Sequence, residues 1–128
     1  MSTIPSRIAG VVVGVLATTH AYSDSSEQLL DTLRAELATI QAASGDEPVG
    51  MTSIPEVDAL RGTSRDVVRS ALGAPDDCGN NESECATQPS WAYWFFYLPP
   101  GWRGGGPELW LTFDAGGLVQ EAEWKFSR

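Results

Sequence analysis

The chain is poor in histidine, in cysteine and in positive charge. Its 128 residues include one histidine, two cysteines and 8 basic against 17 acidic residues, for a net charge of −9. An acidic surface repels phosphate, so we expect neither a nucleic-acid partner nor direct attraction to anionic lipid headgroups. With a single histidine, at position 20, the usual general base and metal ligand are scarce. The sequence therefore predicts no catalytic residues, no metal site, no cofactor and no small-molecule substrate.

Long apolar segments are also scarce, and the one present lies near the amino terminus. Ile8–Ala17 is uncharged, follows Arg7 and precedes the small-residue exit Thr19-His20-Ala21. This pattern is typical of a secretory signal peptide, and the run is shorter than the about 20 apolar residues that span a membrane. We expect residues 1–21 to be a cleaved signal, with a retained anchor or a buried element of the domain as alternatives. The expected location is the periplasm or the exterior, or an association with the outer membrane.

The two cysteines flank a polar, turn-prone loop. Cys78 and Cys85 enclose the sequence Gly-Asn-Asn-Glu-Ser-Glu. An even cysteine count in an exported chain predicts a disulfide, and closing so short a loop stabilises the fold by roughly 2.5 kcal/mol. Zinc binding is disfavoured because two thiols lack further ligands, and redox activity because the spacing is not Cys-x-x-Cys.

An amphipathic helix is predicted at residues 24–43. Ser25 can cap it, with Gln28 three residues later as in a capping box. A narrow apolar stripe recurs at three and four residues, formed by Leu30, Leu33, Leu37 and Ile40. We expect residues 22–48 to hold this helix and a linker, and residues 49–128 to form one α+β domain.

That domain is predicted to contain two short helices followed by three strands. The helices cover 55–60 and 65–72; Thr63 or Ser64 caps the second, Gly73 ends it, and Pro75 prevents its continuation. Apolar runs bounded by glycine-rich turns predict strands at 91–98, 108–114 and 118–126. The expected fold is two short helices packed on a three-stranded antiparallel meander, with the additional amino-terminal amphipathic helix.

Strand alternation divides the apolar side chains between two sheet faces. One set is expected to pack on the helices at 55–72: Trp91, Tyr93, Phe95, Leu109, Leu111, Phe113, Trp124 and Phe126. Leu118 and Ala122 share that face, while Val119, Glu121, Glu123 and Lys125 oppose it. Trp94, Phe96 and Trp110 remain on the far face, a larger aromatic patch than monomers usually expose. We expect the helix at 24–43 to cover this patch, with docking of a partner as the alternative.

The ordered series of motifs resembles the BamE (SmpA/OmlA) family. The series spans Ile54 to Phe126 and consists of Gly62-Thr63, Val67-Val68, Leu72-Gly73-Ala74-Pro75, Trp91-x-Tyr93, Leu109-x-Leu111-x-Phe113 and Gly117-Leu118-Val119. The resemblance implies helices on an antiparallel sheet and a binding activity, since the family includes the small accessory lipoprotein of the β-barrel assembly machinery. It is also similar in fold to the repeats of a secreted β-lactamase inhibitor protein. The chain departs from the family in lacking a lipobox cysteine, so no lipid anchor is expected, and in carrying the cysteine loop and the longer amino-terminal helix.

Two functions from different classes follow. The first is an exported, non-catalytic interaction module that binds a protein partner in envelope or outer-membrane protein assembly or maintenance. Its expected contacts are large aromatic side chains, which are typical interface anchors: Trp94, Phe96, Tyr97, Trp102 and Trp110. The alternative is a secreted or periplasmic enzyme inhibitor that inserts Asp76-Asp77 and the cysteine loop into its target. A hydrolase that uses Glu121 and Glu123 is the least supported function, because this pair is better explained as keeping an edge strand soluble.

Overall fold

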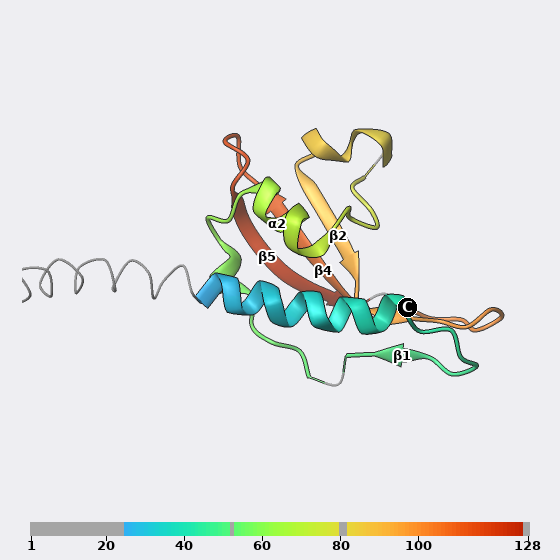
Figure 1. The fold of residues 1–128 in the computed structure, drawn as a ribbon. Coiled ribbons are helices and arrows are strands. Elements are labelled where there is room, and N and C mark those ends of the chain that lie inside the picture. Colours follow the sequence, from blue (N-terminus) through green and yellow to red (C-terminus); the bar gives the residue numbers. More distant parts are fainter. Residues whose placement is uncertain (1–24, 52, 80–81, 127–128) are drawn as a thin grey trace, which may run out of the picture.

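The computed structural model describes residues 25–51, 53–79 and 82–126 (Figure 1). The predicted signal segment, residues 1–21, lies outside these ranges. Over the described ranges, no helix combines the length and the apolar character needed to cross a membrane.

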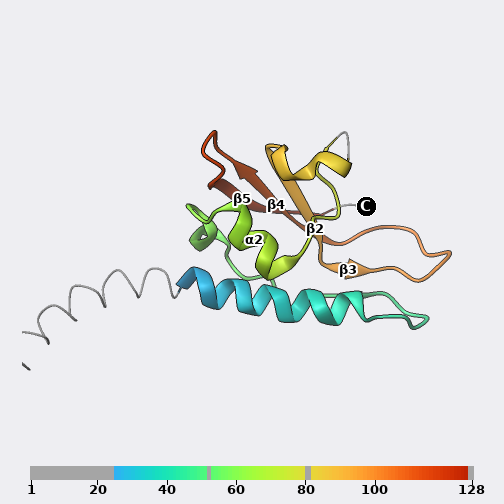
Figure 2. The ribbon, with the colours of Figure 1, turned by 45° about the horizontal axis from the view of Figure 1, so that its top comes forward.

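The fold is α+β, as predicted, with helices on one face of an antiparallel sheet (Figures 1 and 2). The three-stranded sheet has the order β2-β4-β5, and a separate two-stranded sheet pairs β1 with β3. The strands are β1 (Val49–Gly50), β2 (Ser90–Trp94), β3 (Phe96–Tyr97), β4 (Pro107–Phe113) and β5 (Val119–Phe126). Residues 25–41 and α2 (Arg65–Leu72) are helical, and η1 (Asp58–Leu60) and η2 (Glu82–Thr87) are 3-10 turns.

Helix α2 begins after a capping serine and ends at a glycine, and both residue types are typical of those positions. The Oγ of Ser64 accepts a hydrogen bond from the backbone N–H of Val67 at 3.2 Å, which makes Ser64, and not Thr63, the capping residue. Gly73 follows the last turn with φ +82°, a conformation that favours glycine. Val68 and Leu72 are buried between these ends. Local chemistry therefore fixes both the length of α2 and the side that it turns toward the sheet.

The prediction of a helix at residues 55–60 is mostly wrong. Only Asp58–Leu60 forms a short 3-10 turn. The carbonyl of Pro55 accepts a hydrogen bond from the indole Nε1 of Trp124 at 2.8 Å, so a contact with the last strand takes the place of a helical bond. Gly62, with φ +87°, then turns the chain toward α2.

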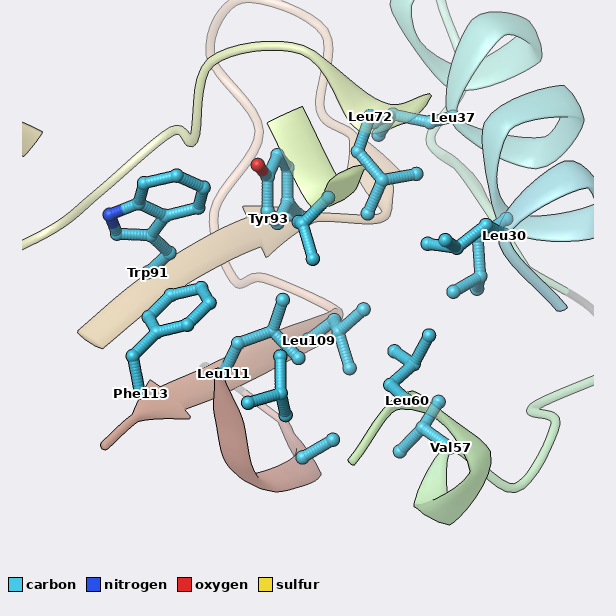
Figure 3. Packing of buried hydrophobic residues seen from close by; sticks show 14 of the residues in the cluster. Leu30, Leu37, Val57, Leu60, Leu72, Trp91, Tyr93, Leu109, Leu111 and Phe113 are labelled. Atoms are coloured by element: carbon cyan, nitrogen blue, oxygen red, sulfur yellow. The ribbon is translucent and has the colours of Figure 1, made fainter. Parts of the chain in front are cut away.

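The helix at 25–41 packs on the same face of the sheet as α2. Its leucines belong to one buried cluster with residues from η1, α2 and the strands (Figure 3), and Figures 1 and 2 show it lying beside α2. Leu33 is fully buried, and Leu30 and Leu37 are nearly so. The expectation that this helix covers Trp94, Phe96 and Trp110 is therefore wrong, because its stripe meets the opposite face.

The apolar stretch predicted as one strand at 91–98 is divided between two sheets. β2 ends at Trp94, where the fully buried Phe95 still donates its N–H to the carbonyl of Pro107 at 2.9 Å. The chain then leaves β4, and Phe96 and Tyr97 pair with Gly50 and Val49. Residues 49–50, for which no strand was predicted, thus become β1 because they pair with β3.

The last strand contains a β-bulge that changes its alternation. Thr112 pairs with Glu121, but Phe113 pairs with Val119, so Gln120 is the extra residue. Val119 is consequently buried beside Phe113. The expectation that placed Val119 outside is wrong, and Leu118 is exposed instead of sharing the core face. Phe126, also expected in the core, is 64% exposed at the end of β5.

The centre of the core is formed as predicted by Trp91, Tyr93, Leu109, Leu111 and Phe113 (Figure 3). The rings of Trp91 and Phe113 meet edge to face with centroids 4.8 Å apart. The indole of Trp91 donates to the carbonyl of Cys85 at 2.6 Å, and the hydroxyl of Tyr93 donates to the carbonyl of Gly73 at 2.8 Å. Each polar group that these rings bring into the core is therefore satisfied.

Candidate functional site: the outer face of the sheet

The face of the sheet that points away from the helices is mixed aromatic and acidic. Strand register gives its rows: Ala92 pairs with Trp110, which pairs with Glu123, while Trp94 pairs with Glu108 and then Lys125. Residues directly opposite each other on paired strands project from the same face. We call the following set the outer face: Ser90, Ala92, Trp94, Glu108, Trp110, Thr112, Glu121, Glu123 and Lys125, together with Phe96, whose ring stacks on Trp94.

Trp110 lies at the centre of the outer face and is held by two charged neighbours. Its Nε1 donates to Oε1 of Glu108 at 2.9 Å, and the Nζ of Lys125 lies 4.9 Å from its ring centroid. An ammonium at this distance is attracted by the electron-rich ring face. Glu108 and Lys125 were not predicted as site residues, although Glu108 lies two positions before Trp110 on one strand and so on the same face.

Trp94 and Phe96 form a second aromatic group beside Trp110. Their rings stack with centroids 6.2 Å apart and an interplanar angle of 26°. Trp94 is 42% exposed, so much of its ring faces solvent. Phe96 lies against Gly106, where an added Cβ would come within 2.6 Å of the Cβ of Phe96. Gly106 therefore has to lack a side chain for this ring to keep its position.

The structure does not bring all five predicted contact residues together. Tyr97 and Trp102 belong to the arm, which we define as the end of β3 after Phe96 and the loop that follows it beyond the sheet (Figure 2). The hydroxyl of Tyr97 donates to the carbonyl of Gly45 at 3.0 Å, which ties the arm to the loop before β1. Trp102 is 53% exposed, in a turn where its N–H donates to the carbonyl of Pro99 at 3.1 Å. The predicted set thus separates into an outer-face group and an arm group.

Two aspartates form hydrogen bonds with the edge of β2 that does not pair with β4. The N–H of Asp76 donates to the carbonyl of Ala92 at 2.9 Å, and the N–H of Ala92 donates to the carbonyl of Asp77 at 2.7 Å. The side chain of Asp76 adds a third bond, accepting from the N–H of Trp94 at 2.8 Å. Burial raises the pKa of the Asp76 carboxyl, and the bond from Trp94 opposes that rise. The pair occupies the backbone groups that another strand would use.

The predicted disulfide is present directly after this edge. Cys78 and Cys85 are bonded with their Cα atoms 5.4 Å apart, and both are buried. Asp77 accepts a hydrogen bond from the N–H of Gly79 at 3.0 Å, which turns the chain into the loop. Within the three described ranges, no group of three histidine, cysteine, aspartate or glutamate side chains could hold a metal ion.

A separate groove of about 450 Å³ lies between the helix at 25–41 and α2. Its walls carry both signs of charge, with Asp31 and Arg34 paired across one turn of the helix. Its lining contains neither histidine nor cysteine. It is lined by Glu27, Leu30, Asp31, Arg34, Asp66, Val67, Ser70 and Ala71.

Comparison with known proteins gives no relative: no protein-family model, no curated protein and no solved structure matches the chain. The resemblance to the BamE family therefore stays a prediction based on the motif series.

Proposed function

We propose that the chain is an exported, non-catalytic interaction module whose outer face binds a protein partner in the cell envelope, in the assembly or maintenance of envelope proteins. One observation carries this proposal. The leucine stripe of the helix at 25–41 and the apolar side of α2 are both used on the inner face, so neither of these two helices covers Trp94, Phe96 or Trp110. Partly exposed aromatic side chains on a rigid sheet are the usual anchors of protein interfaces.

Two further features support export and binding. The Cys78–Cys85 disulfide fits an oxidising compartment outside the cytoplasm. The motif series that resembles the BamE family consists of scaffold residues, and in this chain Trp91, Tyr93 and Phe113 do fill the core. A fold built on such positions leaves its function to the surface, which here is the aromatic face.

Site-specific photo-crosslinking in the native cell tests the proposal. A photoreactive phenylalanine derivative replaces Trp94 or Trp110 on the outer face, and Val67, which is exposed on α2, serves as the matched control. We expect a discrete adduct of constant size from positions 94 and 110 and none from position 67. Equal labelling at all three positions, or no adduct at 94 and 110, would contradict an outer-face interface.

The arm supports a second candidate function, an enzyme inhibitor. Asp76 and Asp77, predicted to insert into a target, are bonded along the edge of β2, whereas Trp102 is more than half exposed on the arm. Trp102 is therefore the better candidate for insertion into an active site. Inhibition assays against β-lactamases and periplasmic proteases, with Trp102→Ala as the comparison, test this function. It requires inhibition that the substitution weakens and that Trp110→Ala leaves intact.

A further inference from the structure

We infer that the partner of the outer face is cationic and binds through arginine-bearing segments that stack on Trp94, Phe96 and Trp110 and pair with the neighbouring glutamates. This inference rests on the proposed function and names the chemistry of the partner. It follows from the charge of the outer face, from the cation that already lies on Trp110, and from the geometry of the second aromatic group.

The outer face carries more negative than positive charge. Glu108, Glu121 and Glu123 project from it, against the single Lys125. In the part of the chain that the structure describes, the one ion pair joins Asp31 to Arg34 on a helix of the other face. The glutamates of the outer face thus have no ion-pair partner among the described residues. A partner that carries positive charge would supply one.

Trp110 already holds a cation. The ammonium of Lys125 lies 4.9 Å from the ring centroid, while Glu108 accepts from Nε1 and fixes the orientation of the indole. This arrangement is a cation site made within one chain. Because Lys125 is exposed on a flexible stem, the lysine can swing away and leave the ring to a guanidinium from a partner.

Trp94 on β2, with Phe96 stacked on it, extends the same chemistry beyond β4. Trp94 pairs in register with Glu108, so an aromatic face and a carboxylate lie on neighbouring strands. A planar guanidinium can stack on such a ring and donate to the carboxylate at once, which an ammonium does less well. Arginine is therefore favoured over lysine.

The other occupants fit less well. An acidic partner, nucleic acid or an anionic lipid surface would meet the glutamates with like charge. A wholly apolar partner would cover the aromatic rings, but it would also take Glu121 and Glu123 out of water without a compensating charge. Both glutamates are exposed, so that cost is avoided in the free protein.

The test is an NMR titration of the disulfide-bonded, ¹⁵N-labelled protein with hexa-arginine, using the five tryptophan indole signals as reporters. Hexa-lysine, hexa-glutamine and hexa-glutamate are the comparison peptides. We expect hexa-arginine to shift the signals of Trp94 and Trp110, and hexa-lysine to bind several-fold more weakly. The signals of Trp91 and Trp124, whose Nε1 groups are bonded within the fold, should stay in place. Hexa-glutamine or hexa-glutamate shifting the same two signals equally, or hexa-arginine shifting neither, overturns the inference.

Two matched double variants separate a built site from general attraction to an acidic protein. Glu121→Gln/Glu123→Gln removes two charges from the outer face, and Glu27→Gln/Glu36→Gln removes two from the helix of the opposite face. The first pair should weaken hexa-arginine binding about tenfold and the second less than twofold, as expected for charge-assisted contacts to a ring-lined site. Equal losses from both pairs would overturn the inference.

Lys125 gives a second matched comparison. Lys125→Gln should strengthen hexa-arginine binding about threefold because it vacates the ring of Trp110, whereas Arg61→Gln, the same charge change at an exposed position beyond η1, should change it far less. An equal gain from both variants counts against the inference.

The crosslinking experiment keeps the two proposals apart. If crosslinking at positions 94 and 110 in the cell is undiminished by Glu121→Gln/Glu123→Gln, the outer face is an interface but its partner is not recognised by charge. If no adduct forms at either position, the interface itself is refuted and the cationic partner with it.

Discussion

Asp76 shows how a single residue can satisfy the hydrogen-bonding groups at the edge of a sheet. Its backbone N–H and its carboxylate both bond to β2, the first to Ala92 and the second to Trp94. Partial burial raises the pKa of this carboxyl in spite of the bond from Trp94. The folded chain therefore favours the neutral acid at this position slightly more than the unfolded chain does.

The sign of this shift predicts the effect of Asp76→Asn. A raised folded pKa contributes stability below the ordinary value of 3.8, and that contribution is lost as the pH rises through the folded value. Asparagine keeps an acceptor for the N–H of Trp94 without the charge. At pH 7 the variant should be more stable than the parent by a few tenths of a kcal/mol, a small gain because solvent screens the carboxylate. The difference should vanish near pH 3.

Urea unfolding of both proteins at the two pH values checks this expectation. Asp76→Ala is the control, because it removes the acceptor as well as the charge and should destabilise the protein at both pH values. A variant Asp76→Asn that is less stable than the parent at pH 7 would show that the charge itself supports the edge.

At the scale of elements, the disulfide closes its own loop and also fixes that loop against neighbouring parts of the fold. The bond joins the segment that closes β2 to the turn η2, and the carbonyl of Cys85 accepts the indole N–H of Trp91. The loop therefore connects the edge of the sheet to the largest ring of the core.

Removing the disulfide with Cys78→Ser/Cys85→Ser should lower the free energy of unfolding by roughly 2.5 kcal/mol, the loop-closure entropy of a short ring. Because the indole N–H of Trp91 donates a hydrogen bond to the backbone carbonyl of Cys85, the fluorescence of Trp91 should also change in the folded variant. Thermal unfolding of the variant and of the reduced parent should agree. A loss well below 1 kcal/mol would mean that the hydrogen bonds around Asp77 and Trp91 hold the loop without the bond.

Some of these elements could be predicted from the sequence, for identifiable reasons. The alternation Leu109-x-Leu111-x-Phe113 is unbroken, so the inward face of β4 was predicted correctly. The bulge at Gln120 depends on pairing between two strands and leaves no mark in either one alone, which is why Val119 and Leu118 were exchanged. β1 was missed because Val49-Gly50 becomes a strand only through its partner Phe96-Tyr97, far along the chain.

The candidate site was predictable to a similar extent. Alternation along β4 and the run from Trp91 identified Trp94, Phe96 and Trp110 as a group apart from the core. It did not show that the leucine stripe at 25–41 packs against the opposite face of the sheet. An amphipathic pattern shows which side of a helix is buried, but not which surface buries it. For the same reason the sequence did not predict the contact between Lys125 on β5 and the ring of Trp110 on β4.

At the scale of the whole molecule, the helix at 25–41 and the strands share one core. Leu30 and Leu37 are buried in the same cluster as Leu60 and Leu72 (Figure 3), and Leu33 belongs to that cluster as well. The helix is thus part of the cooperative unit and not an appendage on a linker.

Leu33→Ala tests this cooperativity. Leu33 is 0% exposed, so the substitution should cost about 3 kcal/mol through lost burial and the cavity that it leaves. Unfolding followed by far-ultraviolet circular dichroism and by tryptophan fluorescence should shift together, as expected of one two-state unit. Thr32→Ala, at an exposed position one residue earlier, should change stability by less than about 0.5 kcal/mol. Separate transitions for the two signals would show that the helix melts independently.

The contact between the beginning and the end of the chain has a consequence for biosynthesis. The leucines of residues 25–41 meet strands that the ribosome makes later, and the carbonyl of Pro55 accepts its hydrogen bond from the indole of Trp124 only after that residue has been made. A nascent chain therefore cannot complete its core until β5 has emerged. Until then the leucines of residues 25–41 lack the apolar side chains that bury them in the folded protein.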